Sequence, residues 1–347
     1  MKYVPFLKLK TNEIRAINDL DENINNNILP FFDVTYRENM TEDLLEENII
    51  AMKKHLANLL GTKHMYIDDY DHIDADYSNY YIVLDNLRDL NIIPVISLNR
   101  EKQRLDDVKY FIDESVENDR LAIRLFLEDI EAFRLIKDDF LEHYEYFSDK
   151  VKTIDIIIDL RVIIDERIDY LKNRVNKFLN EFNKEFSVNK IIITGSSLKN
   201  NIATNSEEVI TRHEYLLWDS LQKDAYDNLV FGDYTIVSPD YVAPTMAVNL
   251  MPNVMTPKVF YTYKDKFFAK RGSAFKTHKD GYGQYFTIAQ RIILKRYFRG
   301  KDFSEGDKYI YERGIVPRPV KIKSGGSPSS WIRATINSHV TYMTNHF

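Results

Sequence analysis

Short apolar, β-branched runs alternate with longer segments of helical periodicity over the first 240 residues of the chain. The runs predict eight strands, over residues 3–9, 28–34, 64–67, 92–98, 121–127, 153–160, 190–194 and 229–237. Between them, apolar residues three or four positions apart predict helices over residues 13–20, 42–60, 80–90, 104–117, 130–140, 163–182 and 212–221. The pattern therefore predicts a regular alternation of strands and helices.

The near-continuous apolar character of these runs, as in Ile154-Asp155-Ile156-Ile157-Ile158, is typical of strands buried on both faces of a parallel sheet. Eight strand–helix units in about 240 residues match a (β/α)₈ TIM-like barrel in number and spacing. An open, doubly wound parallel sheet is the alternative, because the sequence does not show whether the first strand pairs with the last.

After Pro239 the chain becomes rich in proline, glycine and tyrosine, with one helix expected over about residues 287–297. We therefore predict an α/β barrel over residues 1–240 and a Tyr/Pro/Gly-rich C-terminal lobe over residues 241–347, packed on the barrel.

The two parts differ in charge although the whole chain has a net charge of only −6. Residues 251–347 contain 18 Lys and Arg against 6 Asp and Glu, a balance of +12, so the first 250 residues carry −18. Such a split fits either a basic lobe docked on an acidic body or a basic lobe that contacts phosphate.

Composition excludes several classes of site and protein. The chain has no cysteine, which rules out disulfides, Cys-ligated zinc, iron–sulfur clusters and cysteine nucleophiles and fits a cytoplasmic location. No histidine pair has the spacing of a helical zinc site, so neither zinc nor haem is expected. No apolar run approaches about 18 residues, so we expect no membrane contact. Nucleotide-binding glycine loops and the hydrolase elbow are also missing from the sequence.

Polar residues at the carboxyl ends of barrel strands face a common mouth, and they are the candidates for chemistry. We expect four carboxylates to act as acid/base or metal-binding groups: Asp33, Asp159, Asp233 and Glu214. Magnesium bound by Asp33, Asp68, Asp159 and Asp233 is possible, since carboxylates suit a hard cation, but no metal is assigned. The alternative for Asp159 and Arg161 is an internal ion pair that fills the barrel.

The expected ligand-binding residues are cationic or hydroxyl side chains near the same strand ends, together with one arginine of the basic lobe: Lys8, Lys10, Arg124, Arg161, Ser196, Ser197, Arg212 and Arg271. Guanidinium and ammonium groups neutralise an anionic substrate. Gly195-Ser196-Ser197 ends the seventh predicted strand, where barrel loops often bind phosphate, although a simple turn would look the same.

The basic third also interleaves cations with aromatic rings, as at Tyr261, Tyr263 and Lys264. Arg291, Lys295 and Arg299 would form one stripe on the predicted helix. This pattern fits base stacking and phosphate contact, a solvated helix face, or a protein-binding surface in which Tyr261 and Tyr263 are exposed.

Several short motifs recur in a recognisable order. They are Tyr3-x-Pro5-x-x-Lys8-x-Lys10, Ile28-x-Pro30-x-Phe32-Asp33, Gly195-Ser196-Ser197, Arg212-x-Glu214 with Trp218, Gly232-Asp233-Tyr234, Tyr261-Thr262 to Arg271-Gly272, and Trp331 to His339. Together they resemble the beta protein family of bacteria and phages over nearly the whole chain. Thr11-Asn12 stands where that family has Lys-Gly, and Ser338-His339 where it has paired histidines, which weakens a catalytic role for such a pair.

The resemblance implies a barrel-like fold and residence in phage genomes and bacterial defence loci, but it supplies no reaction. The leading hypothesis is a cytoplasmic component of anti-phage defence whose barrel mouth binds a phosphate-bearing ligand, either a nucleotide or nucleic acid. Hydrolysis of the phosphodiesterase type would suit such a site, but the sequence does not decide whether the protein is an enzyme. The alternatives are a non-catalytic subunit that binds a phage protein or a neighbouring effector, and nucleic-acid binding by the basic lobe.

Overall fold

The computed structural model describes residues 2–35, 40–60, 63–69, 79–98, 100–115, 118–163, 167–198, 202–224, 226–240 and 251–346. Within these ranges the chain divides into two compact units. The barrel unit comprises residues 1–10, 28–196 and 213–234, and the second unit, called here the C-terminal unit, comprises residues 11–27, 197–212 and 235–347. No helix in the described ranges combines the length and the apolar character needed to cross a membrane.

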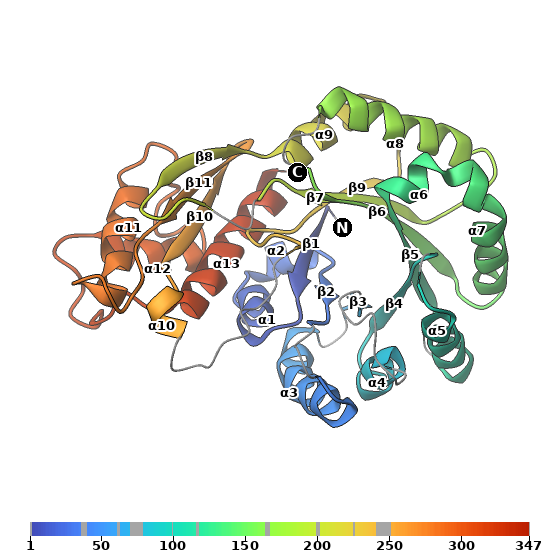
Figure 1. Ribbon diagram of the computed structural model, residues 1–347, viewed down its shortest axis with the longest axis horizontal. Coiled ribbons are helices and arrows are strands. Elements are labelled where there is room, and N and C mark those ends of the chain that lie inside the picture. The colour runs from blue at the N-terminus through green and yellow to red at the C-terminus, as the bar shows by residue number, and fades with distance from the viewer. Residues whose placement is uncertain are drawn as a thin grey trace. The chain divides into compact units, whose positions relative to one another are not determined.

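Eight parallel strands form the closed barrel in Figure 1. In order around the barrel they are β1 (Tyr3–Lys8), β2 (Phe31–Asp33), β3 (Met65–Asp68), β4 (Ile92–Ile96), β5 (Arg120–Phe126), β6 (Thr153–Val162), β7 (Lys190–Ser196) and β9 (Leu229–Asp233). Closure is made by β1 and β9, with Tyr3 opposite Phe231 and Val4 opposite Gly232. The predicted barrel is confirmed, and the open-sheet alternative is wrong.

Helices surround these strands (Figure 1) because each crossover buries one apolar stripe against the sheet. They are α3 (Glu42–Leu60), α4 (Asn79–Asn86), α5 (Lys102–Glu114), α6 (Leu127–Glu131), α7 (Phe133–Ser148), α8 (Ile168–Phe182) and α9 (His213–Leu221), followed by the short 3₁₀ turn η1 (Gln222–Asp224). On α8, for example, Leu171, Val175 and Phe178 are buried. The helix expected over residues 130–140 is two helices, α6 and α7.

The middle of the barrel interior is apolar. Its inward-facing side chains form one cluster: Val4, Phe6, Leu29, Phe31, Tyr66, Ile93, Val95, Ala122, Ile157, Ile192, Val230 and Tyr234. Successive strand residues point to opposite faces of the sheet. The residue two positions after a member of this cluster on the same strand therefore also faces the barrel interior.

The C-terminal unit is a small α+β structure. Its elements are α1 (Thr11–Asn18), α2 (Glu22–Asn26), β8 (Glu207–Thr211), α10 (Met251–Val254), β10 (Lys258–Tyr263), β11 (Lys266–Arg271), η2 (Gly281–Gly283), α11 (Gln284–Ile293), α12 (Glu305–Gly314) and α13 (Pro328–His346). Antiparallel β10, β11 and β8 form a sheet. The sequence pattern did not indicate this sheet, and it assigned residues 11–27 and 197–212 to the barrel.

Long-range contacts place α1 in the C-terminal unit. Arg333 of α13 makes an ion pair with Asp19, just after α1, and the Asn337 Nδ2 donates to the carbonyl of Ala16 at 3.1 Å. The helix α12 also packs closely on α13, because a Cβ at Gly306 would lie 1.9 Å from the carbonyl oxygen of Ala334. These contacts cannot be read from local periodicity.

Candidate functional site

Polar side chains replace the apolar cluster at the carboxyl end of the barrel interior. The inward-facing positions there are Lys8, Asp33, Asp68, Ser97, Arg124, Asp159, Thr194, Ser196 and Tyr234, all of them buried. Because the carboxyl ends of barrel strands carry active sites in characterised TIM barrels, this mouth is the candidate functional site.

Arg124 of β5 lies at the centre of the mouth and binds carboxylates from three other strands. Its Nη1 donates to Asp33 Oδ1 at 3.0 Å and to Asp68 Oδ2 at 2.6 Å. Its Nε and Nη2 donate to Asp159 Oδ2 at 3.0 and 2.5 Å, and Nη2 also donates to the Tyr234 hydroxyl at 2.6 Å. Arg124 therefore links carboxylates from three other strands.

Asp159 has hydrogen bonds at both carboxylate oxygens. Oδ2 accepts from Arg124 and from the Tyr234 hydroxyl at 2.5 Å, and Oδ1 accepts from the backbone N–H of Arg161 at 2.8 Å. Burial raises the pKa of Tyr234 well above its ordinary value, with Asp159 and Asp33 adding to the rise against Arg124, so Tyr234 stays a neutral donor. Asp159 therefore links Arg124, Tyr234 and the backbone of Arg161.

Arg161 lies in an irregular part of β6. The register between β6 and β7 shifts between Asp159 and Val162, and Arg161 has a φ of +53°, which is unusual for a residue with a side chain. Its guanidinium lies 5.9 Å from the ring centre of Tyr234. Although burial lowers the pKa of Arg161, the nearby Tyr234 and Asp159 outweigh this effect and raise it, so the guanidinium remains charged. Backbone strain of this kind clusters at functional sites.

Asp68 ends β3 and Asp69 follows it, and the two carboxylates face two arginines. Asp68 accepts from Arg100 through both oxygens, with a distance of 2.7 Å from Arg100 Nη2 to Asp68 Oδ2. Asp69 Oδ1 accepts from Arg104 Nη1 at 3.2 Å and lies 3.6 Å from Arg100 Nη1. Both carboxylates are fully buried.

Cations outnumber carboxylates in the mouth. Lys8 Nζ lies 3.4 Å from Asp33 Oδ2, and with Arg100, Arg104, Arg124 and Arg161 it makes five cationic groups. Among the described residues, the first four of these cations contact four carboxylates: Asp33, Asp68, Asp69 and Asp159. The described part of the mouth therefore carries a positive excess.

The described contacts of the other two expected catalytic carboxylates, Asp233 and Glu214, lie elsewhere. Asp233 shares a face of β9 with Phe231, which packs against Tyr215 and Trp218 of α9, and it accepts a hydrogen bond from the Tyr3 hydroxyl at 2.5 Å. Tyr234, one residue later, is the inward-facing side chain. Glu214 is buried in the first turn of α9, the helix that packs on β7 and α8.

The remaining predicted binding residues have different surroundings. Ser196 ends β7 in the barrel unit, and Lys10 follows β1 there, whereas Ser197, Arg212 and Arg271 belong to the C-terminal unit. Arg212 is fully buried, with Nη1 3.1 Å from Met343 Sδ and its guanidinium over the Phe267 ring. Arg271 donates to the carbonyl of Ile202 at 2.6 Å and to Thr256 Oγ1 at 2.9 Å.

The expected basic stripe is not a free surface. The helix α11 ends at Ile293, before Arg299, and Lys295 and Arg291 both make ion pairs with Glu207 of β8. Arg299 donates to the carbonyl of Thr262 and to Ser338 Oγ, each at 2.6 Å. Tyr261, which we expected on the surface, is 1% exposed and donates to Asp307 at 2.6 Å, so that expectation is wrong.

No group of three or more His, Asp or Glu side chains in the described ranges is arranged to hold a metal ion. Asp33, Asp68 and Asp159, which we considered as magnesium ligands, surround the Arg124 guanidinium. A bound cation would compete with Arg124 for the same oxygens.

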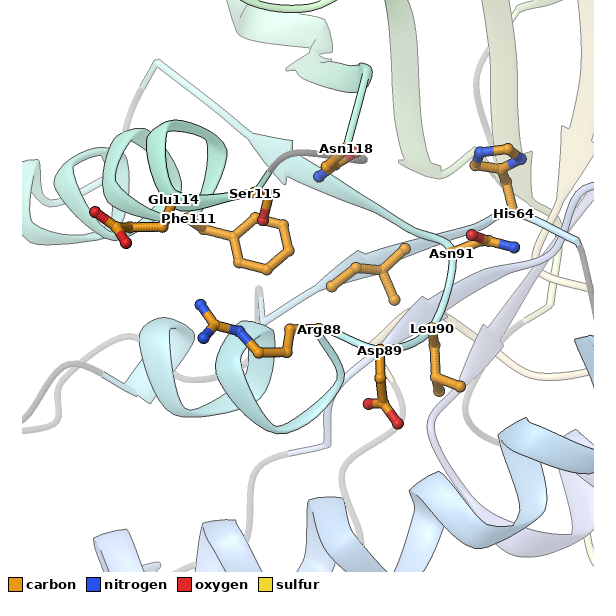
Figure 2. Close-up of a pocket in the computed structure, with 10 residues that line it drawn as sticks. His64, Arg88, Asp89, Leu90, Asn91, Phe111, Glu114, Ser115 and Asn118 are labelled. Atoms are coloured by element: carbon orange, nitrogen blue, oxygen red, sulfur yellow. The ribbon is translucent and has the colours of Figure 1, made fainter.

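A polar pocket of about 300 Å³ lies at the other end of the barrel (Figure 2). Its lining includes His64, Asn91 and Asn118, which precede β3, β4 and β5. Burial lowers the pKa of His64, and Arg120 adds to this effect against Asp119, so the imidazole is neutral at neutral pH. Since the pocket is at the amino ends of the strands, it is separate from the mouth.

Sequence reasoning missed the roles of Arg100, Arg104 and Tyr234. Arg104 is on α5 and Arg100 is in the connection before it, so neither is in a strand. The available signal was the spacing of two arginines at i and i+4 just after a predicted strand. Asp68 was considered only as a possible magnesium ligand, and no sequence feature distinguishes it from the adjacent Asp69.

The family relationship was tested by comparison with known proteins. The family model described as Beta protein matches residues 3–345, nearly the whole chain. No curated protein and no solved structure matches the chain. The chain therefore belongs to the Beta protein family.

Proposed function

We propose that this protein acts in the conflict between bacteria and phages by binding a phosphate-bearing ligand in the mouth of its barrel. The observation that carries the proposal is the cationic excess among the described residues of the buried mouth, where four basic side chains contact four carboxylates and Arg161 adds a fifth cation. A buried site with a positive excess favours an anion, because low polarity strengthens electrostatic attraction. The phage setting rests on the family resemblance alone.

Unused hydroxyl groups support the same proposal. Thr194 on β7 and Ser97 just after β4 face the interior, and both are buried. Among the described residues, neither Thr194 Oγ1 nor Ser97 Oγ has a hydrogen-bond partner. Buried polar atoms normally have partners, so these hydroxyls are suited to a ligand's oxygen atoms.

In this proposal the mouth residues have two kinds of role. Arg161, Lys8 and Ser196 contact the phosphate, and Asp33 and Asp159 hold the cationic side chains in position. Because both oxygens of Asp159 accept hydrogen bonds, its removal would release Arg124 and the backbone N–H of Arg161 together.

Titration calorimetry of the full chain with inorganic phosphate, a nucleoside monophosphate and a short oligonucleotide tests the proposal. We expect at least one of them to bind, and Arg161→Gln to weaken that binding by tenfold or more while the fold is unchanged. The matched control is Arg134→Gln, because Arg134 is an exposed arginine paired with Glu181. Release of inorganic phosphate from the nucleoside monophosphate, or shortening of the oligonucleotide, would report hydrolysis.

Two results would contradict the proposal. One is a wild-type protein that binds none of these anions and releases none after denaturation and mass spectrometry. The other is an Arg161→Gln variant that binds as tightly as the control variant.

A further inference from the structure

The two carboxylates at the end of β3 differ in how completely they are bonded. Asp68 accepts from Arg100 at both oxygens and from Arg124 at Oδ2. Asp69 is equally buried, but only its Oδ1 accepts a side-chain hydrogen bond, from Arg104 Nη1 at 3.2 Å. Neighbouring residues of the same type therefore have different surroundings.

The pair formed by Asp69 and Arg104 has one unused atom on each side. Among the described residues, neither Asp69 Oδ2 nor Arg104 Nη2 has a hydrogen-bond partner, although both atoms are buried. Arg104 is 6% exposed and Asp69 is 0% exposed. An orphaned donor and an orphaned carboxyl oxygen in one contact pair are what a ligand-binding pair would show before its ligand is bound.

The two carboxyl groups also differ in protonation. Burial raises the pKa of Asp69 to about 7 in spite of the opposing charges of Arg104 and Arg100, and the charge of Asp68 adds to the rise. Burial acts on Asp68 as well, but the charges and hydrogen bonds of Arg100 and Arg124 outweigh it and lower its pKa to about 2. Near neutral pH, Asp69 therefore exchanges its proton easily and Asp68 remains ionised.

The groups facing Asp69 come from several elements: Asp68 on β3, Arg100 before α5, Arg104 on α5 and Tyr80 on α4. Tyr80 stays neutral because burial, followed by Asp68 and Asp69, raises its pKa well above the ordinary value. Its hydroxyl is occupied by the backbone of Ile67 and Val95. Asp69 is thus the group of this set that titrates near neutral pH.

We propose that Asp69 and Arg104 form a subsite for a terminal phosphate monoester, with Oδ2 of the protonated Asp69 carboxyl and Nη2 of Arg104 both donating hydrogen bonds to phosphoryl oxygens. The inference rests on the proposed phosphate-binding function and names the chemical class of its ligand. A protonated carboxyl is a donor, so the pair presents two donors to one anion. A dianionic monoester gains more from them than a monoanionic diester.

Binding would then be coupled to proton uptake. Above pH 7 free Asp69 loses its proton and must regain it to bind the ligand, so the affinity falls as the pH rises. The second pKa of a phosphate monoester is about 6, so the ligand itself is already a dianion in that range. We therefore expect the affinity to drop by roughly tenfold between pH 7.5 and pH 8.5.

The test is titration calorimetry of the wild-type chain with a nucleoside 5′-monophosphate at pH 7.5 and pH 8.5, in two buffers of different ionisation enthalpy. At pH 8.5 we expect nearly one proton to be taken up for each ligand bound. The apparent binding enthalpies in the two buffers should therefore differ by nearly the difference between the ionisation enthalpies of the buffers. Asp69→Asn keeps a hydrogen-bond donor but cannot titrate, so its affinity should become independent of pH over this range. Asp113→Asn, an exposed carboxylate paired with Lys150, is the matched control and should behave as wild type.

Further ligands identify the source of the monoester. A nucleoside 5′-monophosphate and an oligonucleotide with a 5′-phosphate carry the required group, and the same oligonucleotide without that phosphate does not. Tight binding of either phosphorylated ligand supports the subsite and shows whether a nucleotide or a nucleic-acid end fits best. Equal binding of the oligonucleotides with and without the terminal phosphate would overturn the monoester assignment.

The outcomes separate this inference from the proposed function. If phosphate binds and Arg161→Gln weakens it, but no proton is taken up, the Asp69 subsite is wrong and the phosphate-binding mouth stands. If no phosphate ligand binds to the wild-type chain, both are wrong. The wild-type proton uptake decides the question even if Asp69→Asn does not fold.

Discussion

The two ends of the barrel interior both contain buried charge, but they use it differently. At the amino end, Asp155 accepts from Tyr66 at 2.7 Å, from Arg120 at 3.1 Å and from Asn189 at 2.7 Å, so one carboxylate faces one guanidinium and two neutral donors. Among the described residues of the carboxyl end, five cations lie beside four carboxylates, and the hydroxyls of Thr194 and Ser97 have no hydrogen-bond partner. Balanced charge serves the fold, whereas the unbalanced end is suited to a ligand.

This contrast agrees with the general division of labour in TIM barrels, in which the carboxyl end carries function and the amino end stability. The polar pocket in Figure 2 is on the stability side, because His64, Asn91 and Asn118 of its lining precede their strands. In this barrel, the hydrogen bonding of buried polar groups therefore indicates the candidate functional site better than the volume of a pocket does.

Among these variants, those that remove the central cation at either end of the barrel should lower the free energy of unfolding most. Arg124→Met leaves three buried carboxylates without their shared partner, and breaking a single buried pair costs about 3–5 kcal/mol. Arg120→Met should cost less, because Arg120 contacts one carboxylate and its side chain is 17% exposed. Urea unfolding of both variants measures the difference, and equal losses would show that the two networks have the same role.

The pH dependence of stability should come mainly from the carboxyl end. Asp69 has a raised pKa in the fold, so its stabilising contribution is present below about pH 4 and is lost as the pH rises through 7. A shift of about three pKa units corresponds to at most about 4 kcal/mol. Asp68 has the opposite sign: its contribution, about 2–3 kcal/mol, is present above pH 4 and is lost as the pH falls toward 2.

Unfolding free energies at pH 4.5 and pH 8 test this assignment. The wild type should lose stability between these values relative to Asp69→Asn, which cannot titrate. If both proteins show the same slope, another group is responsible for the pH dependence.

Single hydroxyl groups should give the smallest effects, with opposite signs at the two ends. Tyr66→Phe removes a bonded hydroxyl and leaves Asp155 with fewer partners, at a cost of about 1–3 kcal/mol, without changing ligand affinity. Thr194→Val removes a hydroxyl that has no partner among the described residues, so it should raise stability by up to about 1 kcal/mol and weaken phosphate binding. A Thr194→Val protein that is destabilised and binds phosphate normally would contradict the assignment of the carboxyl end to ligand binding.

Much of the site was visible in the sequence because strands have a period of two. Asp33, Arg124 and Asp159 were identified from their places at strand ends, and the structure brings their side chains together. The same reasoning did not work for Asp233, because the phase of the alternation places Tyr234 inside instead. It also could not anticipate the shift in register that places Arg161 in a left-handed conformation.

The sequence by itself determined the eight barrel strands and the helices between them, since periodicity and strand ends are local properties of the chain. Tertiary structure decided that β1 closes on β9, that α1 and β8 belong to the C-terminal unit, and that Arg100 and Arg104 cover Asp68 and Asp69. It also separated the two aspartates, because burial and the nearest charges set their protonation, and both depend on residues distant in the chain.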